Sequence, residues 1–139
     1  LMEEWTAGPE MRNTITDQLE RELTQKLSDP NLHYLDFYLT TFDHVAHHNR
    51  DRDSHLHAIQ EFDGTVGRVW SAIQKTPQAA QTALILVSDG VPGYLDEPDV
   101  ASILRTSTAA QEAAERLVEE AVQRGGADNA TAVVVRRRS

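Results

Sequence analysis

The stretch TALILVSDG, residues 82–90, decides the fold that we predict for this chain. It is a continuous apolar run that ends in Ser-Asp-Gly, a pattern typical of a strand buried on both faces. A second apolar run, residues 130–136, follows a glycine-terminated helical segment and predicts another strand. Residues 34–42 are dense in aromatic and β-favouring side chains and indicate a third strand.

Four other segments have helical patterns. Leucine and isoleucine recur every four residues from Ile15 to Leu27, which predicts an N-terminal helix that ends before Pro30. Apolar residues between positions 54 and 75 keep a 3.6-residue period and predict a long amphipathic helix. Two further helices are expected at residues 98–104 and 108–124.

The order strand, long helix, strand over residues 34–88 is that of a right-handed βαβ crossover, which pairs its two strands in parallel. We therefore expect an α/β fold with a small three-stranded mixed sheet packed with about four helices. Strand 82–88 would be central, parallel to strand 34–42 and antiparallel to strand 130–136. A chain of 139 residues is too short for two domains of typical size, so we predict one composite domain, residues 1–139.

Composition excludes several functional classes. The chain is 40% hydrophobic and 25% charged, as in soluble globular proteins, and its longest apolar run is far too short to span a bilayer. Its formal charge of −9 disfavours a nucleic-acid partner, because binding to nucleic acid depends on neutralising phosphates. It has no cysteine, and its first residues have no basic leader pattern, so a cytoplasmic location is expected. The arginines at 136–138 are interpreted as a solubilising tail.

All six histidines fall between His33 and His57, and Asp43 precedes His47 by four residues directly after the predicted strand 34–42. Asp89 follows strand 82–88 in the same way. Ligands of open α/β sheets bind at the carboxyl ends of strands, so we expect Asp43, His47 and Asp89 to hold one or two divalent ions. The alternative is a solvated histidine-rich loop.

Asp128 could join this metal site if strand 130–136 runs antiparallel to strand 82–88, because its start would then lie at the same sheet edge. His44 or His48 could act as a general base, since a near-neutral pKa suits proton transfer at working pH.

Residues from about 12 to 88, above all DFYLTTFDHVAHHNRD (36–51) and TALILVSD (82–89), resemble the alkaline phosphatase superfamily, in its phosphodiesterase and sulfatase-like branch. The resemblance implies that Asp43 and His47 bind one metal and that Asp89 binds a second. Gly90 stands where that superfamily has a further histidine ligand. The superfamily's nucleophile and another metal-binding aspartate have no place before residue 12, and no histidine follows His57.

From about residue 84 onward the resemblance changes. LILVSDGVPGYL (84–95), AAERLV (113–118) and RGGADNATAVVV (124–135) resemble the C-terminal end of a type 2C metal-dependent protein phosphatase. This implies that Asp89 and Asp128 lie at a Mg²⁺ or Mn²⁺ site. The acidic N-terminal segment of that family has only a poor match at residues 62–67. A junction within 82–90 would join an alkaline-phosphatase-like fragment, 1–82, to a type-2C-like fragment, 83–139, in a recombined or designed chain.

The sequence therefore predicts a composite domain of phosphatase fragments that is catalytically incomplete and at most binds a divalent metal weakly, whether Zn²⁺, Mn²⁺, Mg²⁺ or none. The alternative is a phosphoester hydrolase that acts on a phosphate-ester substrate through metal-bound hydroxide. The exposed edges of a three-stranded sheet also suggest a homodimer.

Overall fold

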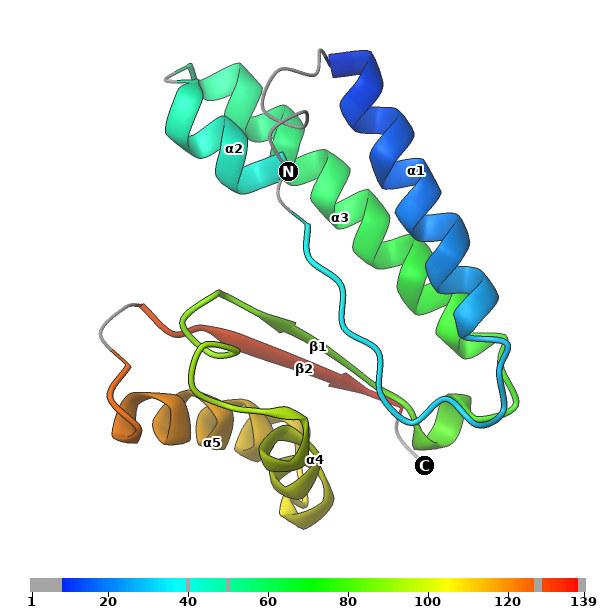
Figure 1. Ribbon diagram of the computed structural model, residues 1–139, viewed down its shortest axis with the longest axis vertical. Helices are drawn as coiled ribbons and strands as arrows, with labels where there is room; N and C mark the ends of the chain where they lie inside the picture. Colours follow the sequence, from blue (N-terminus) through cyan, green and yellow to red (C-terminus); the bar gives the residue numbers. More distant parts are fainter. Residues whose placement is uncertain (1–8, 40, 50, 127–128, 138–139) are drawn as a thin grey trace. The chain divides into compact units, whose positions relative to one another are not determined.

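The structure is a computed structural model that describes residues 9–39, 41–49, 51–126 and 129–137, without the side chains of residues 9–16 and 41–43. It contains two compact units, Leu1–Gln78 and Ala79–Ser139. The described elements, shown in Figure 1, are α1 (Pro9–Lys26), α2 (Thr41–His48), α3 (Arg52–Gln74), the short 3₁₀ helix η2 (Ala79–Gln81), β1 (Ala83–Val87), α4 (Glu97–Thr106), α5 (Ala110–Gln123) and β2 (Ala132–Arg136). The expectation of one composite domain stays a prediction.

The three-stranded mixed sheet predicted from the sequence is wrong. Within the described ranges the sheet has two strands, β1 and β2, which pair antiparallel, and five α-helices accompany it. Residues 32–39 form neither helix nor strand, and α2 begins where the predicted strand 34–42 would end. The parallel pair of a βαβ crossover is therefore not formed in the described part of the chain.

The segment that was predicted as strand 34–42 is nevertheless extended over its described part, and half-buried and exposed side chains alternate along it. Leu35, Phe37 and Leu39 are half-buried, whereas Tyr34 and Tyr38 are 41% and 63% exposed. The β-favouring composition therefore gives an extended chain with alternating side-chain burial, but within the described residues this chain does not pair with another strand. Strand propensity depends on context, since a strand also needs a neighbour to satisfy its backbone groups.

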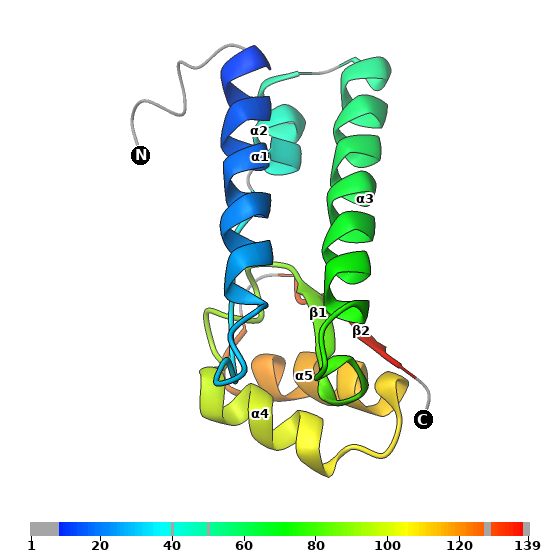
Figure 2. The same ribbon diagram turned by 90° about the vertical axis from the view of Figure 1, so that its right-hand side faces the viewer.

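In the second unit, the antiparallel pairing of the two late strands is confirmed. The register runs from Ala83 opposite Arg136 to Val87 opposite Ala132. Residues directly opposite each other share a face of the sheet, and one face, with Ile85 and Val134, packs against a buried cluster. The cluster consists of Val91, Leu95, Ile103, Leu117 and Ala121. In Figures 1 and 2, α4 and α5 lie on the same side of the two strands.

Helix α5 provides the most deeply buried surface of this unit. Ala113, Leu117 and Ala121 recur at four-residue spacing and are 0% exposed. The two small alanines let the helix lie close to its neighbours, while Leu117 fills the space between them.

One ion pair, between Arg124 and Asp99, connects the end of α5 to the start of α4. Asp96 and Asp99 form a capping box at the start of α4. Arg124, at the end of α5, donates to both carboxylate oxygens of Asp99, with Nη2 at 2.8 Å from Oδ1, and also to Glu120. This guanidinium, together with the capping bonds from Asp96, lowers the pKa of Asp99 to about 2. The end of one helix is thereby fixed to the start of the other.

Arg136 is the last residue of β2 and not part of a solvated tail. Its guanidinium donates to the carbonyl of Leu104 at 2.6 Å and to that of Ser107 at 3.2 Å. Carbonyl groups at a helix C-terminus have no partner within the helix. Arg136 therefore caps the end of α4 from the neighbouring strand.

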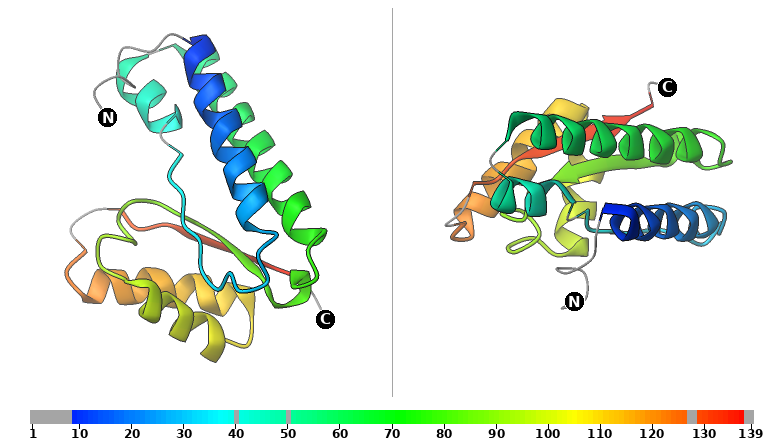
Figure 3. Two further views of the ribbon diagram at one scale, coloured as in Figure 1. Left: turned by 45° about the vertical axis from the view of Figure 1, so that its right-hand side comes forward. Right: turned by 90° about the horizontal axis from the view of Figure 1, so that it is seen from above.

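The first unit is helical. α1 and α3 lie side by side and run in the same direction (Figures 2 and 3), and α2 packs against α3. Arg68 on α3 donates its Nε to Glu20 on α1 at 2.8 Å. The Asp51 side chain accepts the backbone N–H of Ser54 at 2.7 Å and caps the start of α3. No helix in the described ranges is both long enough and apolar enough to cross a membrane.

The Asp99–Arg124 ion pair predicts an acid-sensitive step in stability. A carboxyl whose folded-state pKa is depressed contributes stability above its unfolded value, about 3.9, and loses it as the pH falls through the folded value. We expect the stability of the folded chain to fall between about pH 4 and pH 2, and expect Asp99→Asn to reduce that slope. Urea denaturation at several pH values measures it. Glu119→Gln, on the exposed part of α5, is the control, and an equal change in both variants would contradict the assignment.

We predict opposite effects on stability when Gly90 and Gly67 are each replaced by alanine. A Cβ at Gly90 would lie 2.5 Å from the carbonyl oxygen of Asn129, whereas a Cβ at Gly67 within α3 meets nothing within 4 Å. Gly90→Ala should destabilise the chain by about 1–3 kcal/mol because backbone must move. Gly67→Ala should stabilise it by about 0.5–1 kcal/mol because a helical glycine loses more entropy on folding. Urea denaturation measures both, and a stabilising Gly90→Ala would show that the close approach is not real.

Candidate functional site

The candidate site of the second unit lies where β1 ends and β2 begins. Ser88 follows β1, and its backbone N–H donates to the carbonyl of Thr131 at 3.0 Å. Its hydroxyl donates to the carbonyl of Asn129 at 3.0 Å and accepts the N–H of Thr131 at 2.9 Å. We call these three hydrogen bonds the Ser88 clip. The clip continues the β1–β2 ladder by one step and fixes the chain that enters β2.

Gly90 brings the two segments closer still. The 2.5 Å separation between its hypothetical Cβ and the Asn129 carbonyl oxygen leaves room only for a hydrogen atom at this position. Gly90, which stands where the superfamily has a histidine, is therefore explained within this unit by the close approach of the Asn129 carbonyl. The Ser88-Asp89-Gly90 turn and the Asn129–Thr131 segment lie against each other.

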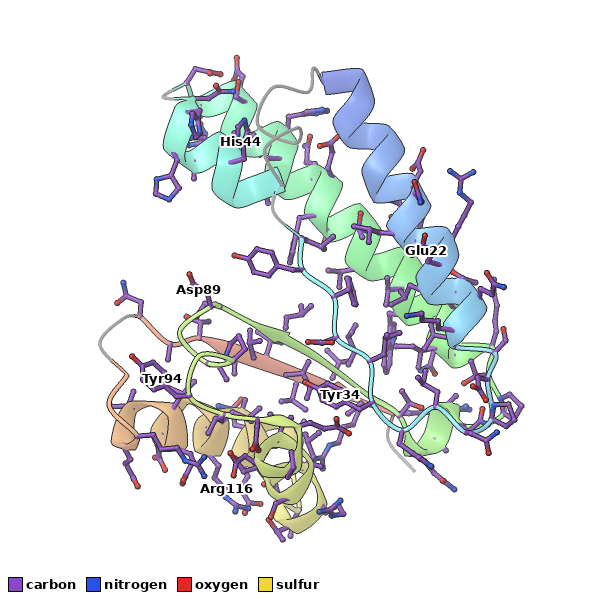
Figure 4. The ribbon with its side chains drawn as sticks, in the orientation of Figure 1. Glu22, Tyr34, His44, Asp89, Tyr94 and Arg116 are labelled. Atoms are coloured by element: carbon purple, nitrogen blue, oxygen red, sulfur yellow. The ribbon has the colours of Figure 1, made fainter. Side chains whose placement is uncertain are left out.

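Asp89 lies between these two contact points, and its side chain is exposed. Figure 4 shows it at the turn that follows β1. The expectation that strand 130–136 begins at the same sheet end as Asp89 is confirmed by the pairing of Val87 with Ala132. Asp128 itself lies outside the described residues, so its role as a ligand stays a prediction.

The other predicted ligands lie in the first unit, on helix α2. The sequence placed Asp43 at a strand end, but both Asp43 and His47 are helical residues, four positions apart. Four residues are about one helical turn, so the two positions share a face of α2. The side chain of Asp43 is not described, and that of His47 is exposed.

His44 and His48, the predicted general bases, form a stacked pair on α2. Their ring centroids are 4.4 Å apart and the rings are inclined by 18°. His48 also has its Nδ1 at 2.9 Å from the backbone carbonyl of His44. Their assignment as general bases stays a prediction.

The structure removes the reason for joining these two groups into one metal site. We expected Asp43 beside Asp89 because strands 34–42 and 82–88 were to pair in parallel, and that pairing is not formed. In the part of the chain that the structure describes, no three histidine, aspartate or glutamate side chains are grouped to hold a metal. The described residues therefore do not fit a complete divalent-metal centre, and we derive no reaction step through one.

The sequence did not reveal the Ser88 clip. Its signal was present in the Ser-Asp-Gly run, where glycine marks a close backbone approach. Local sequence patterns could not identify the partner segment, 129–131, because it is more than 40 positions away along the chain.

A family model for type I phosphodiesterases and nucleotide pyrophosphatases matches residues 1–135. The chain belongs to this family. The match confirms the resemblance to the phosphodiesterase branch of the alkaline phosphatase superfamily, and it continues beyond the junction that we predicted within 82–90. The chain is thus related to phosphoester hydrolases.

The resemblance to type 2C phosphatases is also supported. A probable protein phosphatase 2C 11 from Arabidopsis thaliana is 36% identical over 64 residues, which is 46% of this chain. The match spans only 17% of that protein's length. No solved structure matches the chain. Both of these families are dependent on divalent metals.

Removal of the Ser88 hydroxyl tests the clip. Ser88→Ala leaves the Thr131 N–H without its acceptor, so hydrogen exchange at this amide should become about fivefold faster, as expected for the loss of roughly 1 kcal/mol of local stability. Amide exchange followed by NMR measures it. Ser102→Ala, on the exposed side of α4, is the matched control. Unchanged exchange at Thr131 in the Ser88 variant would contradict the clip.

Proposed function

We propose that this chain is a catalytically incomplete member of the phosphodiesterase family that binds a divalent ion weakly at the β1–β2 sheet end. The ion would lie between Asp89 and Asp128. The observation that carries the proposal is the Ser88 clip, which holds the turn bearing Asp89 against the segment that follows Asp128.

The donor set supports a hard ion and weak binding. Carboxylate oxygens are the ligands that Mg²⁺ and Mn²⁺ prefer, and Mg²⁺ is often bound by one or two carboxylates with several waters. Asp89 is exposed to solvent, so an ion there would keep much of its hydration. A metal site without supporting outer-shell hydrogen bonds to its ligands has low affinity.

The chemistry of Ser88 supports catalytic incompleteness. A serine nucleophile needs its hydroxyl directed at the substrate and a base to accept its proton. The Ser88 hydroxyl instead donates its proton to the Asn129 carbonyl and accepts the Thr131 N–H. The hydroxyl beside Asp89 therefore stabilises the loop and is not poised to attack.

The alternative function is a metal-dependent phosphoester hydrolase that uses Asp43, His47, Asp89 and Asp128 as metal ligands. Membership of the phosphodiesterase family favours it. His44 or His48 would then be the general base.

Turnover of p-nitrophenyl phosphate and of its bis-ester, with Mn²⁺ or Zn²⁺, separates the two functions. We expect no turnover above that of the metal alone. We also expect Mn²⁺ to raise the melting temperature of the unaltered chain but not that of Asp89→Asn, because a ligand that binds only the folded state stabilises it.

Asp43→Asn provides the comparison within α2, and Asp63→Asn, exposed on α3, is the control for charge alone. Turnover that is lost in both Asp43→Asn and Asp89→Asn would establish the hydrolase and refute catalytic incompleteness. An equal metal-induced shift in the unaltered chain and in Asp89→Asn would refute the sheet-end site.

A further inference from the structure

Two histidines on α2 have the spacing of a chelating pair. His44 and His48 are four residues apart on one helix, and their rings are stacked with centroids 4.4 Å apart. His44 is half-buried and His48 is exposed. Figure 4 shows His44 on α2. Both rings belong to a single helical face, so their mutual position depends on α2 alone.

The hydrogen bond of His48 fixes its tautomer. A backbone carbonyl only accepts, so Nδ1 of His48, 2.9 Å from the oxygen of His44, carries the proton. In the neutral ring, Nε2 then carries the lone pair. Metal-binding histidines usually donate their other ring N–H to a carbonyl or carboxylate in this way, which orients the ring and raises its basicity. His48 thus already has the outer-shell partner of a metal ligand.

We propose that His44 and His48 together bind a borderline divalent ion of the Zn²⁺, Ni²⁺ and Cu²⁺ class at the surface of α2. Imidazole nitrogens suit these ions, whereas Mg²⁺ and Ca²⁺ prefer oxygen ligands. The site has two protein ligands, and water supplies the others. It therefore agrees with the finding that the described residues contain no group of three ligands.

Chelation requires the two rings to leave their stack. Two Zn–N bonds of about 2.0–2.1 Å at a tetrahedral angle hold the nitrogens about 3.3 Å apart. The rings are stacked with centroids 4.4 Å apart and an inclination of 18°, so their lone pairs, which lie in the ring planes, do not converge. His48 is held by its hydrogen bond, and the ring of His44 must therefore turn out of the stack about its side-chain torsions before both nitrogens can bind one ion. An ion bound by both rings would connect successive turns of α2 and stabilise it.

This site differs from both metal assignments made above. The superfamily resemblance assigns Asp43 and His47, which lie on a neighbouring face of α2, about 100° around the helix from His44 and His48. The sheet-end site uses aspartates of the second unit. The proposed pair needs neither, so its test is independent of the proposed function.

Isothermal titration of the full chain with ZnCl₂ tests the proposal. His44→Ala and His48→Ala should each weaken Zn²⁺ binding by about tenfold or more, because a chelate that keeps one ligand loses most of its affinity. Alanine favours helix more than histidine does, so neither variant should unfold α2. His57→Ala, exposed on α3, is the matched control and should bind as the unaltered chain does.

Amide hydrogen exchange provides a second readout. The N–H of Asn49 donates to the carbonyl of Val45 at 2.9 Å, at the end of α2. Zn²⁺ should slow exchange at Asn49 in the unaltered chain but not in His48→Ala. Unchanged Zn²⁺ affinity in His44→Ala and His48→Ala would overturn the proposal. A loss confined to His47→Ala would overturn it as well and would assign the ion to the Asp43–His47 face.

Discussion

The antiparallel ladder between β1 and β2 is the constraint on which the second unit depends. It joins segments that are more than 40 residues apart, and the chain between them must therefore fold back upon one face of the strands. Ala113, Leu117 and Ala121 of α5 are buried because the chain folds back and packs α5 against β2 and the turn that contains Val91. The Ser88 clip continues the ladder past the strands with one backbone hydrogen bond and two hydrogen bonds of the Ser88 hydroxyl, so the core and the candidate site depend on the same two paired segments.

Patterns within single segments predicted much of this fold. Helical periodicity located α1, α3, α4 and α5, and the two apolar runs located β1 and β2. The segment 34–42 could not be resolved by pattern alone, because its composition fits an extended chain whether or not a partner strand is present. Once that strand was assumed, the rule for βαβ units imposed a parallel pair that the described chain does not form.

The candidate site was predictable to the same limited extent. Asp89 could be placed at a strand end from the apolar run before it, and its proximity to the start of β2 followed from an antiparallel pair. The helical environment of Asp43 and His47 could not be foreseen after a strand had been assigned up to Phe42. The stacked rings of His44 and His48 and the two bonds of the Ser88 hydroxyl depend on side-chain orientation, which residue spacing does not determine.

The position of Arg136 has a practical consequence for anyone who handles this chain. A truncation after Val135 would remove the guanidinium that covers the last carbonyls of α4. Loss of the last residue of β2 would then appear as fraying of a helix some thirty positions earlier. A fusion that keeps Arg136 leaves these carbonyls covered, whereas one that replaces it exposes them.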